Sequence, residues 1–215
     1  MIKLVVIDFD DTLSLNEQAF FVFENYIAQK LGFRPMSRAA HQKNWGKPVR
    51  EAIVERIPGI NVNAFMDLHK KELPAFVKRG KADVVSKRNL IVLDSLIKRG
   101  KTLVILTSRT MHEVVHLTNK NNPLHMFIKN IYHLNNTKYA KPDPRVFDEI
   151  LSDFAVRPFE ALYIGDSVID GVSAKGAGMK FIALLESGLR SKEDFSSVHV
   201  DFFAQTFPDI LEYIQ

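Results

Sequence analysis

The chain has no cysteine and no long hydrophobic run, and neither sign of charge dominates it. Without cysteine it has no disulfide framework, no thiol nucleophile and no cysteine-ligated zinc or iron–sulfur site. The longest apolar run near the start is Leu4–Ile7, which Asp8 interrupts. That run is too short for the core of a signal peptide, and no stretch approaches the length of a membrane span. We therefore expect a soluble, cytoplasmic protein with no membrane partner.

The 215 residues have an ordinary globular composition, with 46% hydrophobic and 25% charged residues. This composition excludes disordered, collagen-like and fibrous classes, and the length allows one large domain or one domain carrying an insertion. The net charge of +4 is unevenly placed: residues 30–81 hold 12 Lys or Arg against 4 Asp or Glu, a balance of +8 that leaves −4 for the remainder. A basic segment in an otherwise acidic chain indicates a modular protein with an anionic partner.

The apolar pattern predicts strands separated by helices. Short β-rich runs bounded by polar residues predict strands over residues 2–7, 102–106, 131–134, 161–164, 181–185 and 198–203. Helical patterns lie between and after them, over residues 87–98, 112–119, 144–154, 168–177 and 208–214. Most of the strand runs are apolar without alternation, which is typical of parallel strands buried on both faces. The sequence therefore predicts an α/β fold with a doubly wound parallel sheet.

One interval does not fit the alternation of strands and helices, because more than 90 residues separate Asp8 from the next predicted strand, which begins at Thr102. A βαβ unit takes roughly 30 residues, and the helix over 87–98 already supplies the crossover. The surplus is predicted to form helices over residues 16–31, 37–43, 48–57 and 62–79, the last interrupted at Pro74. We therefore predict a core domain of residues 1–14 plus 83–215, with an inserted helical domain of residues 15–82.

Carboxylates follow two of the predicted strands. Asp8 and Asp10 come directly after the first strand, whereas Asp166 and Asp170 follow a later one and lie about one helical turn apart. Ligands of open α/β sheets bind beyond the carboxyl ends of the strands. There, one residue of the first pair could act as nucleophile or metal ligand and the other as proton shuttle, and the second pair suits Mg²⁺. The alternative is that these aspartates form turns and cap a helix.

Two further polar segments stand at strand ends or in adjoining loops. Thr107-Ser108-Arg109 follows the strand over 102–106, and a hydroxyl there can hydrogen-bond a phosphoryl oxygen, although Ser and Thr commonly cap a following helix. Lys141 precedes prolines at 142 and 144, which hold the backbone so that its charge could stabilise an anion. The alternative there is a helix that begins on proline, beside an incidental lysine.

In their order along the chain, these motifs resemble the signature of the haloacid dehalogenase superfamily. DxDxT stands at 8–12, a threonine at 107, a lysine at 141 and GDxxxD at 165–170. The resemblance covers about residues 1–185 outside the insert. The insert is similar to the helical cap of the phosphoglycolate phosphatase and β-phosphoglucomutase type, and its segment 46–51 loosely resembles the substrate-specificity loop of that cap.

The resemblance implies a role for each catalytic position. Asp8 would be the nucleophile that forms an aspartyl-phosphate. Asp10, which the dehalogenases and phosphonatases of the superfamily lack, would protonate the leaving oxygen and then activate water. Thr107 and Lys141 would hold the transferring phosphoryl group. Alignment and neutralisation of spread negative charge are what phosphoryl transfer needs.

The implied cofactor is Mg²⁺, held by the Asp8 carboxylate, the Asp10 backbone carbonyl and Asp166, with Asp170 as a further or outer ligand. The candidates for contact with substrate are Ser108, Arg109, Lys47 and Arg50. The implied activity is hydrolysis of a small phosphorylated metabolite. A sugar-phosphate mutase of the β-phosphoglucomutase type is the alternative, because the same residues serve both and only the phosphoryl acceptor differs. The substrate and the oligomeric state, monomer or homodimer, stay open.

Two patterns favour other functions. The segment 112–116 matches HExxH, which places His112 and His116 on one helical face together with the glutamate base of a zinc peptidase. A distant residue such as Glu149 could be the third zinc ligand. However, Asn119 stands where the extended motif needs glycine. The basic insert with Trp45 could instead contact nucleic acid without catalysis, but aromatic and basic residues do not recur together there. We therefore expect no nucleic-acid partner.

Overall fold

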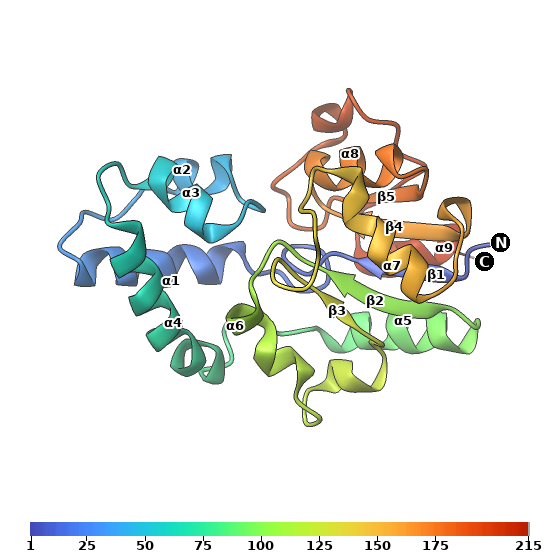
Figure 1. Ribbon diagram of the computed structural model, residues 1–215, viewed down its shortest axis with the longest axis horizontal. Helices are drawn as coiled ribbons and strands as arrows, with labels where there is room; N and C mark the ends of the chain where they lie inside the picture. Colours follow the sequence, from blue (N-terminus) through green and yellow to red (C-terminus); the bar gives the residue numbers. More distant parts are fainter. Residues whose placement is uncertain (215) are drawn as a thin grey trace. The chain divides into compact units, whose positions relative to one another are not determined.

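The computed structural model describes residues 1–214, which form a six-stranded sheet with helices on both faces and a separate group of helices (Figure 1). The strands are β1 (Leu4–Ile7), β2 (Thr102–Leu106), β3 (Ile131–Tyr132), β4 (Ala161–Gly165), β5 (Lys180–Leu184) and β6 (Phe202–Ala204). All adjacent strands are parallel, in the order β3-β2-β1-β4-β5-β6. The predicted doubly wound parallel sheet is confirmed.

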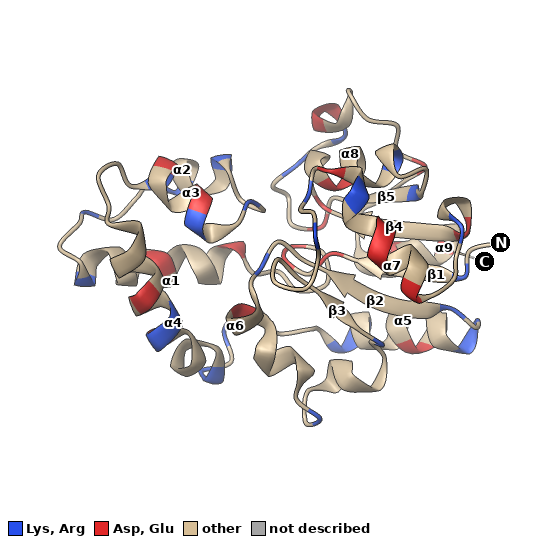
Figure 2. Cartoon of the chain, viewed as in Figure 1, with Lys and Arg blue, Asp and Glu red and all other residues tan. Residues whose placement is uncertain are grey.

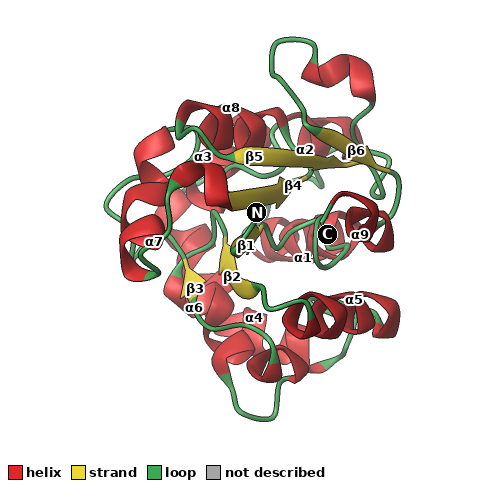
Figure 3. Ribbon diagram, turned by 90° about the vertical axis from the view of Figure 1, so that its right-hand side faces the viewer, coloured by secondary structure: helices red, strands yellow, loops and turns green. Residues whose placement is uncertain are grey.

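Alternate residues of the same strands face the two sides of the sheet. The helices that belong with it are α5 (Lys87–Lys98), α6 (Met111–Val114), α7 (Asp148–Asp153), α8 (Val168–Gly176) and α9 (Ile210–Tyr213). Val5 and Ile7 of β1 pack into the apolar cluster that holds α5 and α9, whereas Leu4 and Val6 pack into the cluster that holds α7 and α8. Figure 3 shows α5 and α9 on one face of the sheet and α7 and α8 on the other. Both faces are covered, and the strands β1, β2, β4 and β5 accordingly consist mostly of buried apolar residues.

The strand order reverses beside β1, and this reversal positions the site. The chain runs outward from β1 through β2 to β3 and then returns to place β4 against the other edge of β1. In register, Ile7 of β1 pairs with Ile164 of β4, and the Asp8 amide donates to the Ile164 carbonyl at 2.9 Å. Such a switch point opens a crevice beyond the carboxyl ends of the two strands. Asp8 and Asp166 follow those strands and therefore lie at the switch point.

Residues 14–84 form a second compact unit by their contacts, whereas residues 1–13 and 85–215 make up the first. Its helices are α1 (Glu17–Lys30), α2 (Arg38–Lys43), α3 (Val49–Arg56) and α4 (Val62–Lys78). Aromatic rings fill its core: Phe23 of α1 stacks on Phe76 of α4 with centroids 4.4 Å apart, and Phe20 meets Phe76 edge to face. Within residues 1–214, no helix combines the length and apolarity needed to cross a membrane.

Several predicted helices differ from those observed. The helix α4 is continuous through Pro74, and Leu73 and Phe76 on either side of the proline are buried in the core of the unit. The segment predicted as a helix over 112–119 instead divides into α6 and a 3₁₀ helix over Val115–Thr118. Likewise, Pro144–Phe147 forms a 3₁₀ helix that leads into α7, as is common at helix ends.

Close packing of α8 on the sheet gives a test of the fold. A Cβ atom added at Gly171 would lie 2.7 Å from Val198 Cγ1 and 2.9 Å from Phe181 Cε1. We expect Gly171→Ala to lower the free energy of unfolding by about 1–3 kcal/mol, despite the better helix propensity of alanine. Urea denaturation measures this change, with Val172→Ala on the exposed side of the same helix as the control. Equal stability of Gly171→Ala and the wild-type protein would contradict the packing.

Candidate active site

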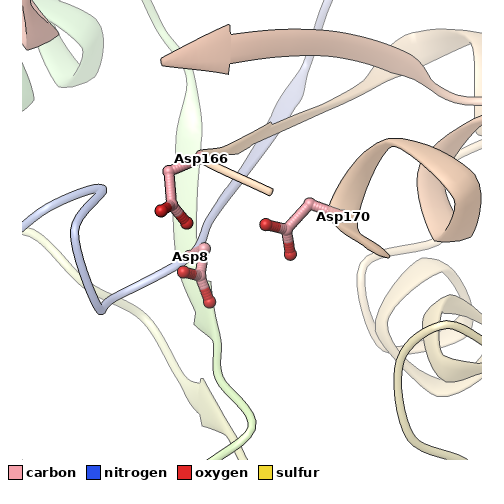
Figure 4. A group of neighbouring side chains, drawn as sticks. All are labelled: Asp8, Asp166 and Asp170. Atoms are coloured by element: carbon pink, nitrogen blue, oxygen red, sulfur yellow. The ribbon is translucent and has the colours of Figure 1, made fainter. Parts of the chain in front are cut away.

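Three aspartates point toward one another beyond the carboxyl ends of β1 and β4 (Figure 4). Asp8 directly follows β1, Asp166 directly follows β4, and Asp170 lies in the first turn of α8. One carboxylate oxygen from each lies within 4.8 Å of the others, and all three side chains are buried. The structure thus brings together three residues that the sequence analysis proposed as metal ligands, from positions up to 162 residues apart.

The two oxygens of Asp170 have different partners. Oδ2 accepts from the Ser167 amide at 3.0 Å and from the Ser167 hydroxyl at 2.5 Å, which caps the start of α8. Oδ1 instead accepts from Lys141 and from the Tyr163 hydroxyl. Gly165 makes this placement possible, since a Cβ atom there would lie 2.6 Å from Asp170 Cβ. Helix capping and site formation, which the sequence analysis treated as alternatives, are both performed by this one side chain.

Lys141 lies at the centre of the hydrogen-bond network. Its Nζ donates to Asp8 Oδ1 at 2.8 Å, to Asp170 Oδ1 at 2.7 Å and to the Tyr163 hydroxyl at 3.0 Å. Burial alone would lower the pKa of Lys141, but the charges of Asp170 and Asp8 raise it well above its usual range. The lysine is therefore a buried, charged ammonium group held between two carboxylates.

The carboxylates outnumber the cation that pairs with them. Burial raises the pKa of Asp8 to about 7, with Lys141 opposing the shift and Asp170 adding to it. Burial also raises the pKa of Asp166 well above its usual range, and the charges of Asp170 and Asp8 reinforce this. A divalent cation at this point would offset the excess negative charge. Buried carboxylate oxygens without histidine are the donors that Mg²⁺ prefers, so the residues present fit that ion.

Asp10, the proposed proton shuttle, is paired with Arg109. Arg109 Nη2 donates to Asp10 Oδ1 at 2.6 Å and Nε donates to Oδ2 at 2.8 Å, so that the guanidinium grips both oxygens. The guanidinium also lies 5.0 Å from the centroid of the Phe9 ring, which fixes it further. A bidentate contact of this kind sets the orientation of the carboxylate. The sequence predicted Arg109 as a contact to substrate but did not indicate this pair, and the contact of Arg109 with substrate stays a prediction.

Thr107 and Ser108 follow β2 at the same edge of the sheet. The Thr107 amide donates to the Tyr132 carbonyl at 3.0 Å, which holds this residue in line with the edge strand β3. Its hydroxyl is buried and accepts from the Arg109 amide at 3.2 Å. A hydroxyl that accepts one hydrogen bond keeps its own proton for donation, as a phosphoryl oxygen would require. Ser108 is half-buried, and its predicted contact with substrate remains a prediction.

The HExxH segment does not form a metal site among residues 1–214. Because α6 ends at Val114 and a 3₁₀ helix follows, the two histidines are not one α-helical turn apart. The Glu113 carboxylate accepts from the Thr110 amide at 2.8 Å and thereby caps α6, whereas Glu149 accepts from the Lys138 amide at 3.1 Å. In the described part of the chain, the converging group of metal-type ligands is the aspartate cluster. The zinc-peptidase alternative has no support.

The two basic candidates in the 14–84 unit have partners within that unit. Lys47 Nζ forms an ion pair with Glu55 at 3.1 Å, and Arg50 Nη2 donates to Asn63 Oδ1 at 3.1 Å. Lys47 and Arg50 are both exposed, and both pairs lie in solvent. Exposed pairs of this kind contribute little to stability, so neither contact prevents an exchange of partners. Their contact with substrate stays a prediction.

The charge of this unit is less one-sided than the window 30–81 indicated. Over residues 14–84 there are 12 Lys or Arg and 7 Asp or Glu, a balance of +5 rather than +8. Figure 2 shows basic and acidic residues together on the helices of this unit. The shorter window left out Glu24, which forms a buried ion pair with Arg56, and Glu17, which pairs with Arg38. These pairs hold α1 to α2 and α3. The positive charges of Arg38 and Arg56 therefore contribute to the packing of the unit.

Comparisons with known proteins identify the family of this chain. The family model described as haloacid dehalogenase-like hydrolase matches residues 5–184, and the chain therefore belongs to that family. Pyrophosphatase PpaX from Bacillus velezensis is 28% identical over 119 residues, which cover 55% of this chain and 54% of that protein. The alignment thus spans about half the length of that curated relative.

Solved structures share the whole fold. A predicted phosphoglycolate phosphatase from Haemophilus somnus is 18% identical with a TM-score of 0.82, and the match covers 100% of this chain and 98% of that one. The structure of CbbY from Rhodobacter sphaeroides in complex with phosphate is 20% identical with a TM-score of 0.77, covering 98% of this chain and 96% of that one. At these identities the likeness concerns the fold.

The raised pKa of Asp8 predicts a pH dependence of stability. A carboxyl with a pKa of about 7 when folded, against an ordinary 3.8, binds a proton more tightly in the folded state. Its contribution to stability is therefore present at low pH and is lost as the pH rises toward 7. In metal-free protein we expect the free energy of unfolding to fall more steeply between about pH 5 and about pH 7.5 for the wild type than for Asp8→Asn. Urea denaturation with a chelator measures both slopes, and equal slopes would contradict the shift.

Proposed function

We propose that this protein is a Mg²⁺-dependent phosphatase that hydrolyses a small phosphorylated metabolite through an aspartyl-phosphate on Asp8. The observation that carries the proposal is the convergence of Asp8, Lys141, Asp166 and Asp170 at the switch point of the sheet, in a member of this hydrolase family. A carboxylate nucleophile, a fixed ammonium and oxygen donors for a divalent cation are the parts that phosphoryl transfer requires.

Each residue then has a defined task. The Asp8 carboxylate attacks phosphorus, so that an oxygen–phosphorus bond forms while the ester bond breaks and the leaving oxygen takes a proton from Asp10. Asp10 next removes a proton from water, which attacks the aspartyl-phosphate and releases phosphate and the free Asp8 carboxylate. Lys141 and Thr107 hold the phosphoryl oxygens throughout. Mg²⁺, which Asp8, Asp166 and Asp170 would hold, supplies neutralisation of the negative charge on the phosphoryl group.

The proposed substrate class rests on the names of similar proteins and on basic residues of the 14–84 unit. Those names are pyrophosphatase and predicted phosphoglycolate phosphatase, and the substrates they denote are small and carry a second anionic group. We extend that class to this chain, with Lys47 and Arg50 as candidates to meet the second anion. The mutase alternative uses the same residues and differs only in the acceptor. A cytoplasmic location and the absence of a nucleic-acid partner stay predictions of the sequence.

A phosphatase screen tests the function directly. Purified protein is assayed against pyrophosphate, phosphoglycolate, sugar phosphates and p-nitrophenyl phosphate, with Mg²⁺, with Zn²⁺ and with a chelator. We expect phosphate release that depends on Mg²⁺ and is greatest for a small substrate with two anionic groups. Phosphoryl transfer between sugar hydroxyls without phosphate release would favour the mutase. Turnover of phosphopeptides or polynucleotide ends alone would overturn the proposed substrate class.

The nucleophile gives the sharpest prediction for activity. Asp8→Asn should lower kcat by about a thousandfold or more, because an amide does not attack phosphorus. Glu113→Gln should leave kcat near that of the wild type, because this glutamate caps α6 and belongs to no converging ligand group among residues 1–214. Steady-state kinetics with p-nitrophenyl phosphate measures both variants. An Asp8→Asn protein that retains a large share of kcat would contradict the assignment.

Substrate contact by the 14–84 unit is tested by charge removal. Lys47→Ala and Arg50→Ala should each raise KM for the best substrate of the screen by about tenfold, the cost of one charge-assisted hydrogen bond. Neither should change KM for p-nitrophenyl phosphate, which has no second anionic group. Lys70→Ala removes the same charge from an exposed position on α4 and is the matched control. If all three variants behave alike, Lys47 and Arg50 are ordinary surface residues.

A further inference from the structure

A tyrosine hydroxyl lies within the active-site network and has no part in the chemistry described above. Tyr163 belongs to β4, and its side chain is fully buried. Its ring meets Phe147 edge to face at 5.0 Å and lies 6.4 Å from Phe181. The ring is therefore fixed by the core of the sheet, while the hydroxyl emerges at the carboxyl edge, 3.4 Å from the Leu106 carbonyl oxygen.

The chemistry of its partners sets the direction of the hydrogen bonds at this hydroxyl. The hydroxyl lies 3.0 Å from Asp170 Oδ1 and 3.0 Å from Lys141 Nζ. An ionised carboxylate only accepts and an ammonium only donates, so the single hydroxyl proton goes to Asp170 and a lone pair faces Lys141. Asp170 thus orients the tyrosine, and the tyrosine in turn offers the lysine a fixed acceptor.

We propose that Tyr163 is a positioning residue that anchors the Lys141 ammonium for phosphoryl transfer, an inference that rests on the proposed function. Of the three partners of Lys141, two have other tasks in the reaction: Asp8 attacks phosphorus, and Asp170 belongs to the metal-ligand cluster. The charges of those two partners are shared with substrate and metal during turnover. The Tyr163 hydroxyl is the partner of Lys141 that has no other task in the reaction, and its ring cannot shift without disturbing the core.

Loss of this anchor has a specific kinetic signature. A lysine side chain is long and flexible, so its ammonium group can occupy different positions in different rotamers. Without the hydroxyl the ammonium remains in the site but is no longer held at one position, which weakens its contact with charge that develops in the transition state. An interaction that matters mainly in the transition state affects kcat rather than KM.

The chain offers a matched control. Tyr132 of β3 is also a buried strand tyrosine whose hydroxyl contacts a carboxylate, Asp153 Oδ2, at 2.6 Å. Tyr163→Phe and Tyr132→Phe remove the same atom from the same sheet and keep both rings in the core. Only the first change touches Lys141. A difference between the two variants therefore reports on the site and not on the loss of a tyrosine hydroxyl as such.

Kinetics with p-nitrophenyl phosphate at saturating Mg²⁺ provide the first measurement. Tyr163→Phe should lower kcat by about 3- to 10-fold with KM within about twofold of the wild type, whereas Tyr132→Phe should leave kcat unchanged. In a Lys141→Ala background, Tyr163→Phe should cause no further loss, because the residue acts through the lysine. Wild-type kcat in Tyr163→Phe, or an equal loss in the Lys141→Ala background, would overturn the proposal.

A metal-free measurement separates this inference from the proposed function. In protein labelled with ¹⁵N-lysine, the Lys141 ammonium is expected to give an NMR signal that its three hydrogen bonds protect from exchange with water, identified by its absence in Lys141→Arg. Tyr163→Phe should shift or broaden that signal, and Tyr132→Phe should not. An unchanged signal in Tyr163→Phe would overturn the anchor. If the wild type hydrolyses no phosphate ester, the proposed function fails, yet the NMR result still decides whether Tyr163 holds Lys141.

Discussion

The contact of the Lys141 ammonium with Asp8 and Asp170 is the interaction on which the rest of the site depends. Removing three carboxylates and one ammonium from water is costly, and the cost is offset only where the charges are paired and hydrogen-bonded. The fold imposes this arrangement, because β1 and β4 are neighbours and their carboxyl ends coincide. With Asp166 included, the carboxyl groups outnumber the ammonium, and burial together with this crowding raises the pKa values of Asp8 and Asp166.

The Asp170 side chain both caps a helix and contacts a residue far away in the sequence. Asp170 begins α8 with one oxygen and meets Lys141 with the other, and Gly165 leaves the space that this requires. Glu113, by contrast, caps α6 and meets no converging ligands within residues 1–214. Both residues follow the same local rule for starting a helix. What distinguishes them is whether the capping carboxylate faces the crevice at the switch point.

The sequence predicted the sheet well because parallel strands buried on both faces are continuous apolar runs, which leave a clear trace in residues such as Leu4–Ile7. It also predicted the meeting of Asp8 with Asp166, because the carboxyl ends of parallel strands share one edge. It did not predict that α4 passes through Pro74, since burial on both sides outweighs the local cost of proline. The pair of Arg109 with Asp10, and Tyr163 beside Lys141, were missed because strand ends place residues at one edge of the sheet but do not specify which side chains pair there. No periodicity records such contacts.

The two aspartates of the first motif, Asp8 and Asp10, are paired with different cations. Asp8 and Asp10 are only two residues apart, yet Lys141 holds the first and Arg109 holds the second, and these cations come from different loops. A single shared cation would draw both carboxylates to one point and give them similar surroundings. Separate partners instead place Asp8 in a buried network with metal-type ligands and Asp10 in a bidentate grip beside Phe9. Two chemically identical side chains thereby acquire different environments, which is the condition for one to act as nucleophile and the other to move protons.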